Sequence, residues 1–365
     1  MTHAEAGSLS ARLRARLLAA IAAAGGWLPF DRFMAMALYE PGLGYYASGH
    51  RLFGAMPASG SDFVTAPELT PLFGQALARQ VAQALDAAQC DEVFEFGAGS
   101  GALAAQLLEA LGEGVRRYSI VDLSGTLRRQ QAERLAAWGD RVHWLDAWPD
   151  ALHGVVVGNE VLDAMPVQLL HWDGEQWFER GVVAQGAALA WADRPTTLRP
   201  PLTGPFVPGT VTEIHLQAEA WVRTLAERLQ RGAAFLVDYG FPQAEYYHPQ
   251  RSGGTLMCHR AHRADADPLA DVGAKDITAH VDFSGIALAA QDAGLDVIGY
   301  TSQARFLLNC GLLELLQGAD LRATAAAQKL LAEHEMGELF KVIGLARGVE
   351  FDPIGFRAGD RCHML

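Results

Sequence analysis

Acidic side chains follow short apolar runs at several points in the middle of this chain. Glu95 precedes a glycine-rich turn, Asp122 ends the next apolar run, and Glu160 follows the run Gly154–Gly158. If these runs are parallel strands of one sheet, their carboxyl ends meet at one edge, where ligands bind. Carboxylates gathered at that edge would favour a ligand that carries a positive charge.

The strongest local motif is the segment Glu95-Phe96-Gly97-Ala98-Gly99-Ser100-Gly101-Ala102. Its glycines allow a sharp turn from strand to helix and let backbone N–H groups approach a nucleotide closely. Gly97, Gly99 and Ala102 also satisfy the dinucleotide pattern, so an NAD oxidoreductase is an alternative, as is a turn without a ligand. Glu95 argues against NAD, because a carboxylate there would repel a pyrophosphate and suit a cation.

Polar residues after two further apolar runs complete the candidate site. Asp122 lies 25 residues after Gly97, where an acid can bind both hydroxyls of a ribose; a helix N-cap is the alternative, which Ser124 could supply instead. Asn159 and Glu160, with Asp163 nearby, form the best catalytic set, against the alternative of a simple helix cap. Glu160 and Asp163 are three residues apart, so in a helical turn they would face the same way.

These residues require a scaffold of alternating strands and helices. We expect strands over 93–96, 118–122, 142–146, 154–158, 233–238, 296–300 and 340–345, with helices between several of them. Such alternation predicts an α/β fold with a mostly parallel sheet covered on both faces.

Other segments interrupt or precede this pattern. Residues 167–210 are predicted as a β insertion, in which Asp173-Gly174 marks a hairpin, and 241–283 as a loop insertion. Residues 1–90 are expected to form a helical arm and lid, before a domain over 91–365. In that arm one helix should end at Gly25-Gly26, and another should begin near Pro67 with Thr65 and Glu68 as a capping box.

Composition excludes several classes of protein. Among 365 residues, 29 Lys and Arg stand against 42 Asp and Glu, which gives a net charge of −13. That balance disfavours nucleic acid and anionic membrane surfaces as partners. The uncharged stretch 17–30 is too short to span a bilayer, and we expect neither a signal peptide nor membrane insertion.

Cysteine usage bears on compartment and on metal binding. Four cysteines without a CxxC pair indicate a reducing, cytoplasmic compartment. Cys258-His259-x-x-His262 could suggest zinc, but no second ligand pair accompanies it, so no metal is expected.

Several motifs in order resemble one family, the MidA-type methyltransferases, nearly from end to end. They are Tyr39-x-Pro41-x-x-Gly44-Tyr45-Tyr46, Asp62-Phe63-x-Thr65-x-Pro67-Glu68, Glu95 to Gly101, Asn159-Glu160-x-x-Asp163-Ala164-x-Pro166-Val167, Asp238-Tyr239-Gly240 and Asp276-Ile277-Thr278-Ala279-His280-Val281-Asp282-Phe283. The turn also resembles the first motif of class I S-adenosylmethionine methyltransferases. Two departures are Ala98, where the family often has proline, and Ser61, where Gly-Asp-Phe is usual.

The resemblance implies a seven-stranded class I methyltransferase sheet (Rossmann-like), an N-terminal lid and S-adenosylmethionine as cofactor. It implies a protein arginine as methyl acceptor, in a subunit of respiratory complex I, and permits a homodimer. Methylation of a small molecule or of another protein side chain, and a non-catalytic cofactor-binding assembly factor, are the alternatives. Asp146 resembles the acid that meets the adenine amino group.

The candidate residues therefore fall into three sets. The expected catalytic residues are Glu160 and Asp163. The expected cofactor-binding residues are Glu95, Gly97, Ala98, Gly99, Gly101, Asp122, Leu123, Asp146, Ala147 and Asn159. The expected substrate or lid residues are Tyr46, Asp62, Phe63, Thr65, Pro67, Glu68, His280 and Asp282; for His280 an ordinary structural role is the alternative.

Overall fold

The computed structural model describes residues 3–48, 65–122, 125–260 and 263–365. Its contacts divide the chain into two compact units, each made of three separate stretches. The arm unit comprises Met1–Phe63, Leu162–Glu219 and Phe241–Gly285. The sheet unit comprises Val64–Val161, Ala220–Gly240 and Ile286–Leu365. The predicted division into an N-terminal lid, a catalytic domain and two insertions assigns functions to segments of the chain, and it stays a prediction.

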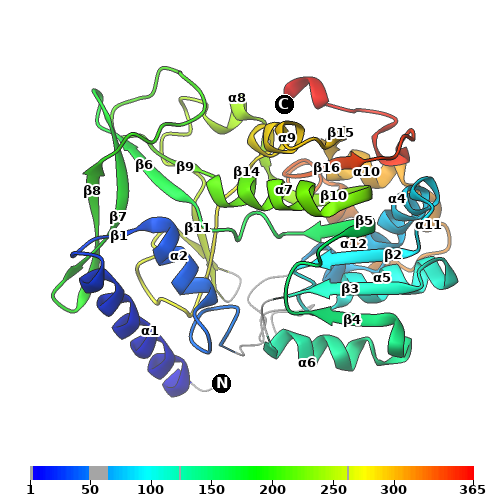
Figure 1. The fold of residues 1–365 in the computed structure, drawn as a ribbon, viewed down its shortest axis with the longest axis horizontal. Coiled ribbons are helices and arrows are strands. Elements are labelled where there is room, and N and C mark those ends of the chain that lie inside the picture. Colours follow the sequence, from blue (N-terminus) through cyan, green and yellow to red (C-terminus); the bar gives the residue numbers. More distant parts are fainter. Residues whose placement is uncertain (1–2, 49–64, 123–124, 261–262) are drawn as a thin grey trace. The chain divides into compact units, whose positions relative to one another are not determined.

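Seven strands form the main path of an eight-stranded sheet at the centre of the sheet unit (Figure 1), in the order β15-β16-β10-β5-β2-β3-β4. Strand β16 runs antiparallel to both neighbours, and the other pairs are parallel. This arrangement confirms the predicted class I α/β fold. The strands are β2 (Glu92–Phe96), β3 (Arg117–Val121), β4 (Val142–Leu145), β5 (Leu152–Asn159), β10 (Leu229–Phe241), β15 (Asp296–Ser302) and β16 (Phe340–Arg347).

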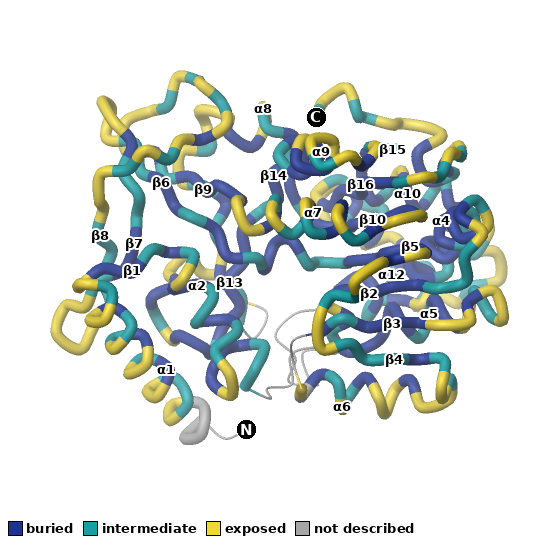
Figure 2. The backbone as a smooth tube through the Cα atoms, viewed as in Figure 1, coloured by how far each residue is buried: buried dark blue, intermediate teal, exposed yellow. Residues whose placement is uncertain are grey.

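Most residues of the central strands are buried (Figure 2), and helices cover both faces of the sheet. Val93 of β2 belongs to a core with Phe73 and Leu77 of α4, whereas Phe96, on the opposite face, contacts Trp221 of α7 at 5.2 Å between ring centroids. The helices are α3 (Ala66–Leu69), α4 (Leu72–Ala88), α5 (Ala102–Leu111), α6 (Gly125–Arg134), α7 (Leu216–Arg228), α9 (Phe283–Asp292), α10 (Gln303–Asn309), α11 (Leu312–Leu315) and α12 (Leu321–Leu331).

The arm unit contains an antiparallel sheet and the N-terminal helices. Its main sheet has the order β1-β7-β6-β9 with β8 against β7, and a smaller sheet has the order β12-β11-β13. Its elements are α1 (His3–Ala23), β1 (Leu28–Pro29), α2 (Phe30–Tyr39), β6 (Gln168–Trp172), β7 (Trp177–Gln185), β8 (Ala188–Pro195), β9 (Val211–Ile214), α8 (Gln243–Tyr246), β11 (Met257–Arg260), β12 (Arg263–Asp265), β13 (Asp276–Thr278) and β14 (Val281–Asp282).

The predicted hairpin of the β insertion is confirmed. Trp172 of β6 pairs with Trp177 of β7, and the Asp173 carboxylate between them accepts hydrogen bonds from the backbone N–H groups of Glu175 (2.7 Å) and Gln176 (2.8 Å). The side chain of Asp173 therefore closes the turn, as an Asx turn does. Helix α1 ends before Gly25, whose φ of 75° only glycine adopts without strain.

No helix in the described parts of the chain is both long and apolar enough to cross a bilayer.

Candidate cofactor and active site

The glycine turn joins β2 to α5 at the carboxyl end of the sheet. Gly97, Gly99 and Gly101 have φ angles of 64°, 54° and 80°, in the left-handed region that favours glycine. The φ of Gly97 favours glycine, and a Cβ atom there would also make a tight contact of 3.1 Å with Cγ2 of Val161. Phe96 pairs with Gly158 of β5, which places the turn beside the end of that strand.

Glu95 is buried next to this turn, with only 2% of its surface exposed. Its Oε2 atom accepts a hydrogen bond of 2.6 Å from the hydroxyl of Tyr118 on β3. Burial raises the pKa of Glu95 to about 8, against the opposing effect of the Tyr118 hydrogen bond, and the charge of Asp122 raises it further. A cation bound nearby would favour the ionised carboxylate.

Asp122 follows β3, and one of its oxygens is fixed by a neighbouring amide. Nε2 of Gln131 donates a 2.9 Å hydrogen bond to Oδ2 of Asp122. Asp146 differs from it: its side chain is 91% exposed and forms an ion pair with Arg128. Ala147 is exposed, and Leu123 lies outside the described residues.

The backbone turns sharply after β5. Glu160 has a φ of 55°, one of three positive values among non-glycine residues in the described parts of the chain. Its N–H donates to the carbonyl of Val237 (2.9 Å), and the next N–H, that of Val161, donates to Oδ2 of buried Asp238 (3.1 Å). Strained conformations of this kind are kept where surrounding contacts over-determine them, which happens often at active sites.

The side chains at this turn leave an acceptor for a ligand. Nδ2 of Asn159 donates a 2.9 Å hydrogen bond to Oε1 of Glu160. Oδ1 of Asn159 is buried and accepts no hydrogen bond within the described structure. Buried acceptors normally have a donor, and the ammonium and hydroxyl groups of S-adenosylmethionine are donors. The glycine turn, buried Glu95 and this acceptor are therefore compatible with that cofactor.

The helical turn that would make Glu160 and Asp163 face the same way does not form. The left-handed residue Glu160 and the turn at 163–164 break any helical path, and no helix follows directly, so the helix-cap alternative is wrong as well. The boundary between the compact units falls after Val161, and Asp163 belongs to the arm unit. There Asp163 is buried, and its carbonyl accepts a hydrogen bond from the N–H of Ala279 (3.0 Å).

Tyr46 of the arm unit lies in a partly buried acidic and aromatic cluster. Its hydroxyl donates to Oδ2 of Asp276 (2.9 Å), and its ring stacks on Tyr39 with centroids 5.6 Å apart. Burial, followed by the charges of Asp276 and Asp163, raises the pKa of Tyr46. The arm unit thus brings Tyr46 and Asp163, both predicted from the sequence, into one electrostatic environment.

Other expected substrate residues have local structural contacts. The N–H of His280 donates to Oγ1 of Thr255 (3.0 Å), and its ring lies 5.2 Å from that of Phe241. Asp282 accepts hydrogen bonds from the N–H groups of Ser284 (3.1 Å) and Gly285 (3.2 Å), while burial raises its pKa to about 7. Asp62 and Phe63 lie outside the described residues.

Glu68 does not complete the capping box expected with Thr65. Thr65 is the N-cap residue of α3 but makes no side-chain cap hydrogen bond. The Glu68 carboxylate instead accepts hydrogen bonds from Oγ of Ser100, in the glycine turn, and from Nη1 of Arg134 at 2.8 Å. The adjacent carbonyl of Pro67 accepts from Nε2 of Gln106 on α5 (2.7 Å). Long-range contacts replace the local cap: the ion pair with Arg134 joins α3 to α6, and the hydrogen bond from Ser100 joins it to the glycine turn.

Four residues that were not predicted as site residues contact these groups. Tyr118 contacts Glu95, and Gln131 contacts Asp122. Arg134 contacts Glu68, and Asp238 accepts from the N–H of Val161. Asp238 belongs to one of the family motifs, so the sequence could have identified it as a candidate site residue. The others act across distant segments, so no local pattern reveals them.

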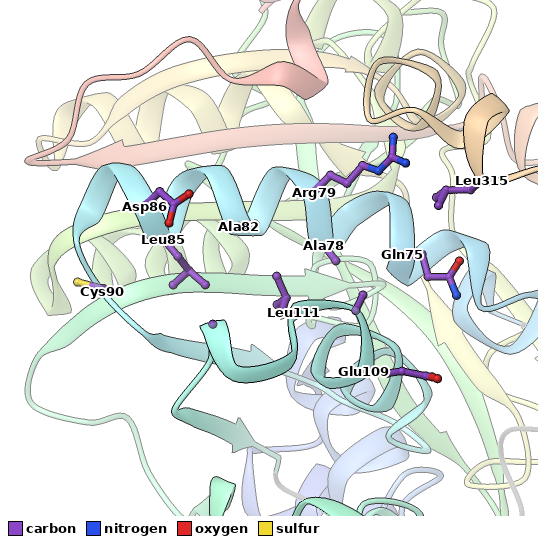
Figure 3. A pocket seen from close by; sticks show the side chains of 12 residues that line it. Gln75, Ala78, Arg79, Ala82, Leu85, Asp86, Cys90, Glu109, Leu111 and Leu315 are labelled. Atoms are coloured by element: carbon purple, nitrogen blue, oxygen red, sulfur yellow. The ribbon is translucent and has the colours of Figure 1, made fainter.

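One hollow of about 460 Å³ lies elsewhere in the sheet unit, between α4 and α5 (Figure 3). Cys90 and Gly114, which line it, precede β2 and β3, so it lies at the amino ends of these strands. Cofactors bind at the carboxyl ends in folds of this type. Among the residues that the structure describes, no group of three or more His, Cys, Asp or Glu side chains could hold a metal ion. His262 lies outside the described residues.

The sequence of residues 76–301, more than half of the chain, matches the profile of a family described as S-adenosyl-L-methionine-dependent methyltransferases. The chain belongs to this family. Its methyltransferase activity and its cofactor, S-adenosylmethionine, are those of the family.

Curated relatives and a crystal structure extend the comparison of this methyltransferase. A Danio rerio protein named protein arginine methyltransferase NDUFAF7, mitochondrial, is 26% identical over 89% of this chain and 85% of its own. The Drosophila melanogaster homologue is 27% identical over 82% and 74% respectively. A Burkholderia thailandensis protein, crystallised with S-adenosyl-homocysteine, is 52% identical over 100% of this chain and 99% of its own, with a TM-score of 0.95.

Proposed function

We propose that this methyltransferase transfers the methyl group of S-adenosylmethionine to an arginine side chain of a protein. The observation that carries the proposal is the left-handed Glu160, whose carboxylate is held by Asn159 directly after β5. Support for arginine comes from the curated relatives, which are named protein arginine methyltransferases. A subunit of respiratory complex I is the proposed substrate, as the family resemblance suggests.

The chemistry explains why a fixed carboxylate matters. S-adenosylmethionine supplies an electrophilic methyl group when bound. A guanidinium is a poor nucleophile because its pKa exceeds about 12 and its charge is delocalised. A carboxylate that accepts two of its N–H groups localises the charge and leaves another nitrogen free to attack. We assign that role to Glu160, with Asp163 as a second proposed carboxylate.

The cofactor residues have proposed roles of their own. The N–H groups of the glycine turn would contact the cofactor where Gly97, Gly99 and Gly101 let the backbone approach. Asp122 would bind the ribose hydroxyls, and Oδ1 of Asn159 would accept a hydrogen bond from the cofactor. Glu95 would complement its positive charge.

Labelling identifies the acceptor. The purified protein would be incubated with labelled S-adenosylmethionine and host lysate, and labelled peptides would be located by mass spectrometry. We expect label on arginine in a discrete protein. Label only on a small molecule or on another side chain would contradict the proposal, and absence of any label would indicate a cofactor-binding protein without this activity.

A substitution at Glu160 tests the assignment of the carboxylate. Glu160→Gln should bind S-adenosyl-homocysteine with wild-type affinity in calorimetry and lose methyl transfer. Glu133→Gln, which changes an exposed glutamate on α6, is the matched control and should retain both. Full activity of Glu160→Gln would disprove the role of Glu160.

The compartment is also a proposal. The four cysteines, all among the described residues, are free thiols, which suits a reducing compartment. We propose the cytoplasm, whereas the curated relatives are named mitochondrial. Fractionation of cells followed by immunodetection would distinguish these locations.

A further inference from the structure

Helix α6 carries three polar side chains on one face that contact the loops at the carboxyl ends of β2, β3 and β4. Arg128, Gln131 and Arg134 are spaced three residues apart, so they lie along one face of the helix. We call these three residues the α6 ridge. The family comparison and the sequence motifs assign no role to any of them.

The two arginines of the ridge hold loop atoms. Nη2 of Arg128 donates to the carbonyls of Asp122 (2.9 Å) and Leu145 (2.7 Å), which follow or end β3 and β4. Nη1 of Arg134 donates to Oγ of Ser100 in the glycine turn (2.8 Å) and to Glu68. One helix therefore joins three loops that belong to different strands.

Gln131 lies between the arginines and is completely buried. Its Nε2 atom donates hydrogen bonds of 2.9 Å to both the carbonyl of Gly99 and Oδ2 of Asp122. Its Oε1 atom accepts a 2.9 Å hydrogen bond from Nε1 of Trp144 on β4. Because Trp144 fixes which end of the amide is the acceptor, both N–H groups of Gln131 are directed at the cofactor loops.

We propose that Gln131 is a positioning residue for the cofactor, which fixes the carboxylate of Asp122 relative to the glycine turn. The inference rests on the proposed contact between Asp122 and the ribose hydroxyls. An amide that bonds one carboxylate oxygen restricts the rotation of that carboxylate and so fixes the direction of its other oxygen as well. The role is reached through Asp122, so Gln131 itself need not touch the cofactor.

The test compares two ligands that differ only at the ribose. Calorimetry would measure the affinities of four proteins for S-adenosyl-homocysteine and for its 2′,3′-dideoxy analogue. The proteins are wild type, Gln131→Leu, Asp122→Asn and the double variant. We expect Gln131→Leu to weaken S-adenosyl-homocysteine about 10- to 100-fold, the range of a hydrogen bond to a charged group. The affinities of wild type and Gln131→Leu for the dideoxy analogue should agree within about twofold. The double variant should lose little more affinity for S-adenosyl-homocysteine than Asp122→Asn alone, because the two substitutions act on one contact.

Separate results identify which assumption fails. Normal binding of S-adenosyl-homocysteine by Asp122→Asn would disprove the ribose contact and the proposal built on it. Impaired Asp122→Asn with normal Gln131→Leu would disprove positioning while leaving the ribose contact intact. Equal weakening of both ligands by Gln131→Leu would show a general structural role and would also overturn the proposal. The matched control Gln130→Leu, one position earlier in α6, should bind both ligands as wild type does.

A second variant gives a readout that a merely structural residue would not change. Gln131→Glu keeps an acceptor for Trp144 but, when ionised, has no donor for Asp122. We expect its affinity for S-adenosyl-homocysteine, relative to wild type at the same pH, to improve as pH falls from 7.5 to 5.5, because the protonated carboxyl can donate. A ratio that does not change with pH would overturn the proposal. If Gln131→Leu does not fold, this variant decides the outcome alone.

Discussion

The hydroxyl of Tyr118 donates a hydrogen bond of 2.6 Å to Oε2 of Glu95, and both side chains are buried inside the sheet unit. A hydrogen bond from a phenol favours the ionised carboxylate, but burial disfavours it more strongly. The pKa of Glu95 therefore rises to about 8. The carboxyl is largely protonated at neutral pH until a cationic ligand approaches.

Stability should depend on pH through Glu95. Its folded pKa of about 8 exceeds its value of 4.5 in the unfolded chain, so the folded state holds an extra proton between these pH values. The free energy of unfolding should fall as pH rises through this range, by at most about 1.4 kcal/mol per pH unit. Urea unfolding of ligand-free protein from pH 5 to 9 would measure it.

Glu95→Gln is the control for this pH effect. The variant should lose the part of the slope that belongs to Glu95, while Asp282, whose pKa is also raised, to about 7, continues to contribute with the same sign. An identical pH dependence in wild type and variant would contradict the assignment.

Gly97 should tolerate no side chain. Its φ is 64°, and a Cβ atom added to it would meet Cγ2 of Val161 at 3.1 Å. Gly97→Ala should therefore destabilise the protein by about 1–2 kcal/mol and weaken cofactor binding. Thermal unfolding and calorimetry with S-adenosyl-homocysteine would measure both effects. Gly114→Ala, where nothing lies within 4 Å, is the control, and similar behaviour of the two variants would refute the steric argument.

The ion pair between Arg134 and Glu68 should stabilise the attachment of α3. Arg134→Met leaves Glu68, whose side chain is only 10% exposed, without its cation and should cost about 1–2 kcal/mol. Urea unfolding would detect the loss, and hydrogen exchange should increase in residues 66–69. Arg129→Met, at an exposed position of the same helix, should change neither measurement. Unchanged exchange in Arg134→Met would show that the hydrogen bonds from Ser100 and Gln106 suffice to anchor α3.

Glu213 should be essential to the arm unit. Its buried carboxylate accepts hydrogen bonds from the N–H groups of Thr255 (2.8 Å) and Leu256 (2.9 Å) and from the hydroxyl of Tyr246 (2.8 Å). Glu213→Leu leaves the buried N–H of Thr255 unpaired and removes the acceptor of the other two donors, although the Tyr246 hydroxyl keeps His215 and Thr255 as partners; the change should cost about 3–5 kcal/mol. Urea unfolding would measure this cost. Glu175→Leu, in the exposed hairpin turn, should have little effect; equal losses would contradict the argument.

Local patterns predicted much of the fold. The run Gly154–Gly158 and the Asp173-Gly174 turn each specify a strand or hairpin within a few residues, and the structure confirms both. The sequence did not reveal that no helical turn follows Asn159, because the carbonyl of Val237 and the carboxylate of Asp238 determine that backbone from another strand. The capping role expected of Glu68 is wrong for the same reason, since Arg134 lies 66 residues away. Side chains that act between distant segments leave no local periodicity to detect.

The interleaving of the two compact units has a consequence for synthesis on the ribosome. Strands β5 and β10 are parallel neighbours, yet the β6–β9 region of the arm unit is made between them. Pairing across so long a connection is slow, and β10 still needs β16, which emerges near the end of the chain. A chain ended at Gly285 would expose the edge of β10 and invite aggregation. Neither unit can therefore be obtained by simple truncation, and nascent chains should depend on chaperones until β16 is complete.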